Sequence, residues 1–201
     1  MGQAVIFDIG GVLLDWDPRN LYRKMLPDET SIDAFFDEVG FANWNAQQDK
    51  GRQWSEGVAD LSEQFPHRSS LIEAAHLRWN EMIENTFPDT VVILESLAAQ
   101  QFPLYAITNF SSEKWGEVQK RFEFLSLFRD AVVSGDEKVM KPDAAIFQCL
   151  LTRNDLQAGE CIFIDDSPVN TKGAEALGMK TVRFETSAQL RNELEEHGLI
   201  I

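Results

Sequence analysis

The chain has 201 residues and a formal net charge of −15 at pH 7. This negative charge argues against binding along a nucleic-acid backbone and against docking on anionic lipid, since both surfaces repel an acidic protein. Hydrophobic residues make up 44% and charged residues 25%, which is typical of a globular protein with one sizeable core. No apolar run is long enough to span a membrane and no leader precedes the first motif, so we expect a cytoplasmic protein.

The first predicted element is a strand over Val5–Phe7. From about Asp17 to Asn85 no strand is predicted. This stretch instead carries apolar residues at helical spacing, which predicts a small bundle of helices. The two clearest stripes are Trp54, Val58, Leu61 and Phe65, followed by Ile72, Ala75, Trp79, Met82 and Ile83.

After the helical stretch, strands and helices alternate. The predicted strands are the apolar runs Leu104–Ile107, Ala131–Val133, Cys161–Ile164 and Thr181–Phe184. Continuous apolar runs of this kind are typical of parallel strands covered on both faces. The helices between them begin near Pro88, Ser111, Asp143, Pro168 and Ser187, and Gly178 and Gly198 end the last two.

This order predicts an α/β fold, with a doubly wound, mainly parallel, Rossmann-like sheet and a small inserted α-helical cap domain. We place the core domain at residues 1–16 and 87–201 and the cap domain at 17–86. The two cysteines, Cys149 and Cys161, are interpreted as small buried hydrophobic residues, because neither a disulfide nor a metal pair is indicated. His76 is expected to be packed or partly buried, and His67 and His197 to face solvent.

Polar residues stand where the predicted strands end. In strand order, the first strand ends at Asp8, the second at Thr108 and Asn109, the third is followed by Lys141, and the fourth ends at Asp165 and Asp166. Ligands of open α/β sheets bind at the carboxyl ends of the strands. We therefore expect these residues to converge on one small volume.

The charges of this group predict its ligands. Three carboxylates placed together repel one another unless a cation lies among them. An oxygen-rich site suits Mg²⁺, which also keeps water and substrate phosphate as ligands. The Lys141 ammonium, the Thr108 hydroxyl and a backbone amide near Asn109 add donors, so the site resembles a receptor for a phosphoryl group. Singly, each motif is ordinary turn or cap chemistry; the joint placement carries the prediction.

The ordered motifs resemble those of the haloacid dehalogenase (HAD) superfamily. They are Asp8 with GVLLD, Thr108–Asn109, Lys141–Pro142 and Asp165–Asp166. The resemblance covers essentially the whole chain, and the helical insert resembles the cap that follows the first motif in many members. The chain looks most like the sugar-phosphate phosphatases with a four-helix cap and the phosphatase domain of epoxide hydrolases.

The resemblance implies a Mg²⁺-dependent phosphohydrolase that acts on a small phosphorylated metabolite. Asp8 would attack phosphorus and form an aspartyl-phosphate, which water then hydrolyses. Asp8, the backbone carbonyl of Gly10, Asp165 and Asp166 would hold Mg²⁺. Thr108, Asn109, Lys141 and the Gly10 backbone would contact the phosphoryl group, with Thr108 and Lys141 assisting catalysis.

Gly10 departs from the family pattern. Many members carry a second Asp two residues after the nucleophile, as general acid and base, and general acid–base catalysis contributes roughly 10²–10⁴ in rate. Three consequences are open. The substrate has a good leaving group, such as an aryl, acyl or anomeric sugar phosphate; a cap residue such as Asp49 or His67 supplies the proton; or the activity is slow.

Three other functions stay open at this point. A 2-haloacid dehalogenase also lacks the second Asp, but its Ser-Ser-Asn pattern differs from Asp165–Asp166. A phosphonate-cleaving enzyme would use a cap lysine, and Lys24 and Lys50 are the lysines of the insert. A non-catalytic binding or regulatory protein is the alternative from another class. Specificity is expected to lie in the cap, where Trp44 and Asp49 are candidates for substrate contact; oligomeric state is not predicted.

Overall fold

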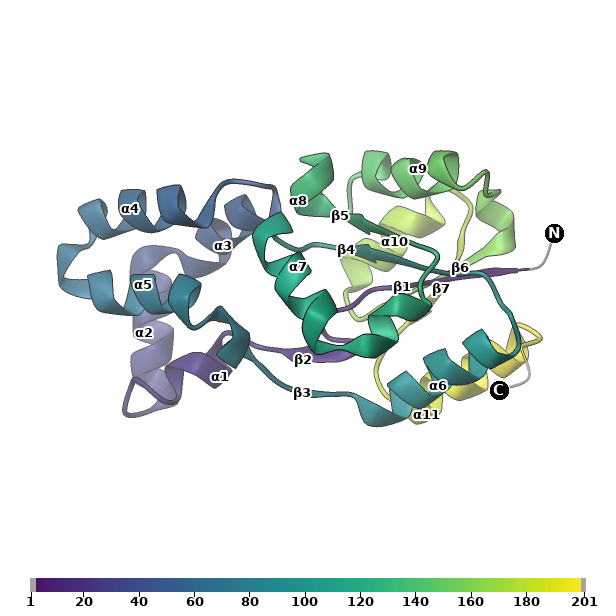
Figure 1. Ribbon diagram of the computed structural model, residues 1–201, viewed down its shortest axis with the longest axis horizontal. Coiled ribbons are helices and arrows are strands. Elements are labelled where there is room, and N and C mark those ends of the chain that lie inside the picture. The colour runs from purple at the N-terminus through teal and green to yellow at the C-terminus, as the bar shows by residue number, and fades with distance from the viewer. Residues whose placement is uncertain (1–2, 200–201) are drawn as a thin grey trace.

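The computed structural model describes residues 3–199. Its centre is a parallel sheet of five strands in the order β5-β4-β1-β6-β7 (Figure 1). The strands are β1 (Ala4–Phe7), β4 (Leu104–Thr108), β5 (Asp130–Val133), β6 (Cys161–Asp165) and β7 (Lys180–Arg183). Every neighbouring pair is parallel, so the predicted fold class is confirmed.

Alternate residues of each strand feed two separate cores. In β1, Val5 and Phe7 belong to one cluster of buried residues, whereas Ala4 and Ile6 belong to the other. This alternation follows from the strand geometry, which points successive side chains to opposite faces. Because both faces are covered, the strands read as unbroken apolar runs in the sequence.

Helices cover both faces of the sheet (Figure 1). On one face α6 (Pro88–Ala99) packs beside α11 (Ser187–Glu196), with α7 (Ser112–Arg121) nearby; on the other lie α9 (Ala144–Arg153) and α10 (Pro168–Glu175). The side chain of Asp143 accepts a hydrogen bond from a backbone amide in the first turn of α9. Thr186 and Gln189 form a capping box at the start of α11. A short helix, α8 (Ser134–Glu137), follows β5.

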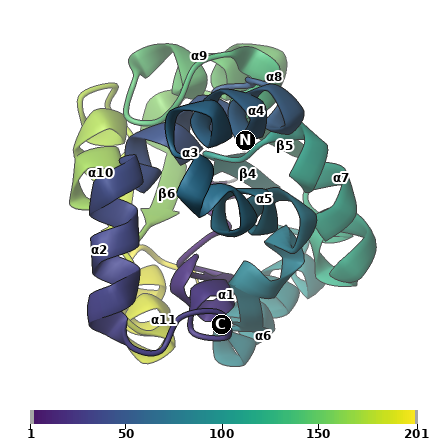
Figure 2. The same ribbon diagram turned by 90° about the vertical axis from the view of Figure 1, so that its left-hand side faces the viewer.

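The inserted helices lie beyond the carboxyl ends of the strands, and Figure 2 looks onto them with the sheet behind. They are α1 (Arg19–Tyr22), α2 (Glu29–Val39), α3 (Phe41–Asp49), α4 (Trp54–Gln64) and α5 (Ser69–Leu77). Aromatic rings fill the centre of this region. Tyr22 and Trp54 are fully buried, and Phe36 stacks on Phe41 at a centroid distance of 4.5 Å. The buried side chains of the insert therefore pack together, and they form one continuous cluster with those on one face of the sheet.

The prediction of no strand between Asp17 and Asn85 is wrong at its C-terminal end. Strand β2 (Leu14–Trp16) pairs antiparallel with β3 (Ile83–Thr86). The second helical stripe ends early: α5 stops at Leu77, a 3₁₀ helix covers Trp79–Met82, and Ile83 begins β3. Local spacing cannot show this, because β3 is held by hydrogen bonds to a segment about 70 residues earlier. The two-stranded ribbon carries the chain from the sheet to the insert and back (Figure 1).

Smaller predictions had mixed outcomes. Cys161 is buried, but Cys149 on α9 is half-buried, packed against the core cluster without belonging to it. His76 is half-buried and stacks on Trp54, and His67 is exposed, as expected. His197 is half-buried rather than open to solvent. None of the helices within residues 3–199 is long and apolar enough to cross a membrane.

Candidate active site

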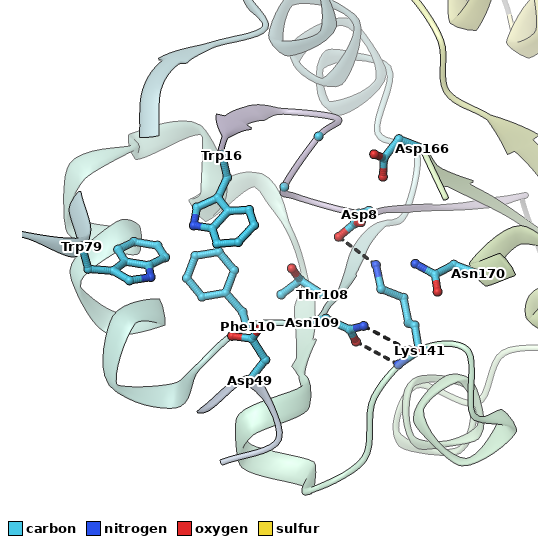
Figure 3. A pocket seen from close by; sticks show the side chains of 12 residues that line it. Asp8, Trp16, Asp49, Trp79, Thr108, Asn109, Phe110, Lys141, Asp166 and Asn170 are labelled. Carbon is cyan, nitrogen blue, oxygen red and sulfur yellow. Dashed lines mark hydrogen bonds and ion pairs between the residues drawn. The ribbon is translucent and has the colours of Figure 1, made fainter. Parts of the chain in front are cut away.

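The strand ends bring the predicted polar residues together. Asp8 follows β1, Thr108 ends β4 and Asp165 ends β6, and these three strands are neighbours in the sheet. Figure 3 shows Asp8, Thr108, Lys141 and Asp166 around one cavity. The cavity, called here the first cavity, has a volume of about 300 Å³ and is also lined by Gly10 and Asn109. The first cavity lies at the carboxyl ends of the strands, and open α/β sheets bind their ligands at this edge.

Lys141 lies at the centre of the charged groups. Its Nζ is 2.8 Å from Asp8 Oδ1 and 2.7 Å from Asp165 Oδ2, and its side chain is 1% exposed. Burial disfavours the ammonium, but the two carboxylates outweigh burial and raise the pKa of Lys141. Lys141 therefore stays charged and fixes the position of Asp8 relative to Asp165.

Asn109 holds the backbone of Lys141 from the neighbouring strand end. Its Oδ1 accepts a hydrogen bond from Lys141 N at 2.8 Å, and its Nδ2 donates to Lys141 O at 3.1 Å (Figure 3). The sequence suggested a backbone amide near Asn109 as a phosphoryl contact. The structure adds that the Asn109 side chain positions Lys141, a role that sequence spacing does not reveal.

Three carboxylates form a group that suits a metal ion. Asp8, Asp165 and Asp166 each offer a ligand oxygen, and these oxygens lie within 4.8 Å of one another. Burial raises the pKa of Asp8 to about 7, with Asp165 adding to the shift and Lys141 opposing it. Burial and Asp165 also raise the pKa of Asp166. A hard divalent cation such as Mg²⁺ would relieve this repulsion, so the donor set fits it.

Both oxygens of Asp165 already have donors. Oδ1 accepts from Ser167 N at 2.9 Å and from Asn170 Nδ2 at 3.0 Å, while Oδ2 accepts from Lys141. Asp8 accepts from Ile9 N and from Lys141 through Oδ1. The Asp166 carboxyl accepts hydrogen bonds from the backbone amides of Asp166 and Ser167. Within residues 3–199, Asp8 Oδ2 has no hydrogen-bond donor, which leaves this oxygen free for a cation.

Asn170 and Ser167 were not predicted. Asn170 is the third residue of α10, and side chains in the first turn of a helix lean back toward its N-terminus. The signal in the sequence was an amide two residues after Pro168, the residue that begins the helix directly behind Asp165 and Asp166. That helix start could have identified Asn170 as a partner of the acidic pair.

Gly11 is required beside the acidic group. Its φ of +77° is left-handed, and a Cβ there would lie 2.7 Å from Asp166 Oδ2. We predict that Gly11→Ala displaces the Asp166 carboxylate and adds about 1–2 kcal/mol of backbone strain. Isothermal titration should show weaker Mg²⁺ binding than in the wild type. Gly116→Ala in α7, where a Cβ meets nothing within 4 Å, is the matched control. Unchanged Mg²⁺ affinity in Gly11→Ala would contradict this prediction.

Aromatic side chains form one wall of the first cavity. Trp79 and Phe110 meet edge to face at 5.2 Å, and Trp16 lies beside Phe110 (Figure 3). Within residues 3–199, the buried Nε1 of Trp16 has no hydrogen-bond partner. In the sequence, Trp79 lies on a helical stripe and Trp16 is the last residue before the insert. The sequence alone could not assign either to the site, since both reach it through the unpredicted β2–β3 ribbon.

A second cavity of about 660 Å³ lies beside the first and is lined mainly by residues of the insert. Phe36, Phe41 and Met140 give it an apolar surface, and Asn45 lines it with an amide. The side-chain Oδ1 of Asn45 is buried and has no partner among the described residues. Arg19, the cation on this surface, is already paired with Glu29 and Asp33.

The cap candidates separate into two groups. Asp49 lines both cavities, so the structure brings it to the site. Trp44 does not reach either cavity; its Nε1 donates to Gly57 O, and its ring packs against Trp54 inside the insert. His67 forms an ion pair with Glu38 on the surface, away from the cavity linings. The cap lysines are also remote: Lys24 pairs with Glu81, and Lys50 is exposed outside both linings.

A family model of haloacid dehalogenase-like hydrolases matches residues 3–178. The chain belongs to this family. The HAD-like chain is 30% identical over 216 aligned residues to acyl-CoA dehydrogenase family member 10 of Mus musculus, covering 96% of this chain but 19% of that protein. It is 26% identical to the sesquiterpene phosphatase AstK of Aspergillus oryzae, covering 96% of this chain and 95% of the other.

The fold also matches solved structures of the same kind. The HAD family enzyme BT-2542 of Bacteroides thetaiotaomicron, in complex with magnesium and inorganic phosphate, superposes with a TM-score of 0.70 at 24% identity. The match covers 92% of this chain and 96% of that one. Five parallel strands with an inserted helical region are therefore the fold of a HAD-like hydrolase, as the motifs indicated.

Proposed function

We propose that the chain is a magnesium-dependent phosphohydrolase that acts through an aspartyl-phosphate on Asp8. The observation that carries the proposal is the acidic group beside the first cavity, in which the Lys141 ammonium pairs with Asp8 and Asp165 while a third carboxylate, Asp166, has a ligand oxygen within 4.8 Å of theirs. Such a site is short of positive charge, and a divalent cation and a phosphate together would complete it. The phosphatase AstK, which aligns over nearly its whole length, supports the same class of reaction.

Asp8, the Gly10 carbonyl and Asp166 would hold Mg²⁺, with Asp165 assisting directly or through water. When bound, the ion neutralises charge on the phosphate and orients it. Asp8 would attack phosphorus; in support, its carboxylate faces the cavity and Lys141 fixes its direction. Thr108, the backbone beyond it and Lys141 would donate to the oxygens of the transferring group and stabilise their charge in the transition state.

The second cavity suggests the substrate class. Its surface mixes aromatic and aliphatic side chains with amides, and its one arginine is paired with Glu29 and Asp33. A second phosphate on the substrate would thus find no free cation among the described residues there. The unpartnered Asn45 Oδ1 and Trp16 Nε1 would suit hydroxyl groups. We infer a single phosphate on an uncharged, partly apolar, hydroxyl-bearing molecule, a class that includes sugar phosphates and other esters with a good leaving group.

The test is hydrolysis of p-nitrophenyl phosphate with Mg²⁺ and with EDTA. We expect turnover with the metal, loss of turnover with EDTA, and recovery when Mg²⁺ is restored in excess. Halide release from 2-haloacids, independent of metal, would identify the chain as a dehalogenase instead. Absence of turnover on phosphate esters and on haloacids alike would leave a binding or regulatory role.

A further inference from the structure

The two cavities meet at a short border. Trp16, Asp49 and Asn109 line both of them. A substrate with its phosphate beside Asp8 and its organic part in the second cavity must cross this border. The ester oxygen is one bond from phosphorus, so it lies on the side of the first cavity that faces the second. Of the three border residues, Asp49 alone has a side chain that can give a proton to the ester oxygen and later take one back.

The surroundings of Asp49 favour a neutral carboxylic acid. It is the last residue of α3, and its Oδ2 accepts a hydrogen bond from Asn45 Nδ2 at 2.7 Å. In the described part of the chain no lysine or arginine pairs with this carboxyl group. Burial raises the pKa of Asp49 to about 8, with a hydrogen bond from the Ser111 amide opposing the shift. Both donors to Asp49, the Asn45 amide and the Ser111 backbone amide, are uncharged, so neither supplies the positive charge that would hold the carboxyl group ionised.

Asp49 is fixed to the core as well as to the insert. The hydroxyl of Ser134, in α8, donates to the carbonyl oxygen of Asp49 and accepts a hydrogen bond from Phe110 N. Gly51, two residues after Asp49, accepts a hydrogen bond from Lys138 Nζ through its carbonyl oxygen at 3.1 Å. These contacts tie the end of α3 to the segment that follows β5. The Asp49 side chain therefore keeps its place relative to the strand ends where Asp8 and Asn109 lie.

The other ionisable groups of the first cavity have different roles. Asp8 is the nucleophile, Asp166 belongs to the acidic group that suits a cation, and Lys141 is held between two carboxylates. Gly10 lines the cavity without a side chain. An alkoxide leaving group nevertheless needs a proton as the bond to phosphorus breaks. The lining residues of the first cavity leave Asp49 as the group that can supply it.

We propose that Asp49 is the general acid and base of this site, an inference that rests on the proposed phosphatase function. As the bond from Asp8 to phosphorus forms and the bond from phosphorus to the ester oxygen breaks, Asp49 gives its proton to that oxygen, and the alcohol leaves. Water then attacks phosphorus from the vacated side. The Asp49 carboxylate takes the proton of the water, the bond to Asp8 breaks, and both carboxyl groups return to their starting states.

The test is Asp49→Asn, with Asp60→Asn as the matched control, since Asp60 is an exposed aspartate of α4 in the insert and lines neither cavity. Single-turnover and steady-state rates are measured with p-nitrophenyl phosphate and with an alkyl phosphate. For Asp49→Asn we expect a rapid burst of p-nitrophenol, close to one per enzyme, and then turnover slowed by roughly 10²–10⁴-fold. With the alkyl phosphate we expect no burst and a similar loss. Asp60→Asn should behave as the wild type.

The burst separates a proton-transfer role from a structural one. p-Nitrophenolate leaves without a proton, so the first step should survive in Asp49→Asn, whereas misfolding or misplacement of the cap would slow it too. A burst slowed as much as the steady state, or equal rates for Asp49→Asn and wild type on the alkyl phosphate, would overturn the assignment. Failure of the wild type to hydrolyse any phosphate ester would instead overturn the proposed function.

Discussion

Replacing Asp8 with asparagine is expected to reduce phosphate-ester turnover by roughly 10⁴-fold or more, because the attacking carboxylate oxygen is lost. The side chains have nearly the same shape, and the asparagine oxygen can still accept from Ile9 N and Lys141 Nζ, the present partners of Asp8 Oδ1. Lys141 also keeps its ion pair with Asp165. The substitution should therefore leave the fold intact while removing the chemistry.

Turnover of p-nitrophenyl phosphate with saturating Mg²⁺ measures this effect, and circular dichroism and thermal unfolding check the fold. Asp155→Asn is a suitable control. Asp155 is exposed, lies outside both cavities and has a φ of +52°, a left-handed conformation that asparagine also adopts readily. Activity within a few-fold of wild type in Asp8→Asn would exclude Asp8 as the nucleophile and with it the aspartyl-phosphate.

Replacing Lys141 with methionine is expected to destabilise the metal-free protein by about 3–5 kcal/mol, because it leaves Asp8 and Asp165 buried without their cation. For a chain of this length such a loss lowers Tm by roughly 10 °C. Because Mg²⁺ would supply part of the missing positive charge, the ion should raise the Tm of Lys141→Met by more than it raises that of the wild type. Loss of a donor to the phosphoryl oxygens should also lower kcat by roughly 10²–10³-fold.

Thermal unfolding with EDTA and with Mg²⁺, together with steady-state kinetics, tests both parts. Lys172→Met is the control, since Lys172 is an exposed lysine of α10. A Tm for Lys141→Met equal to that of the wild type in EDTA would show that the buried ion pairs contribute little to stability. An unchanged kcat would remove Lys141 from the phosphoryl site.

The sequence by itself determined the sheet and the convergence of the polar residues on its edge. Continuous apolar runs that alternate with helical stripes imply a parallel sheet covered on both faces, and parallel strands bring their carboxyl ends to one edge. Asp8, Thr108 and Asp165 each end or follow one of three neighbouring strands. Their proximity therefore needed no knowledge of how side chains pack.

Only the tertiary structure decided which partners these residues have. The pairing of Asn109 with the Lys141 backbone, and of Asn170 with Asp165, depends on how loops turn after their strands, which periodicity does not encode. Trp44 and Asp49 belong to the same helix and the same polar stretch. One is buried against Trp54, while the other lies at the border of two cavities.

The insert shows most clearly that local sequence does not reveal contacts between distant segments. Its helices follow from local apolar spacing, but the β2–β3 ribbon forms between segments about 70 residues apart and does not follow from either segment alone. That ribbon sets where Trp16 and Trp79 lie and so sets one wall of the first cavity. Local periodicity thus determined the strands of the main sheet and the helices of this protein. Contacts between distant segments determined the β2–β3 ribbon and placed Asp49 and the aromatic wall, because only those contacts orient the insert over the strand ends.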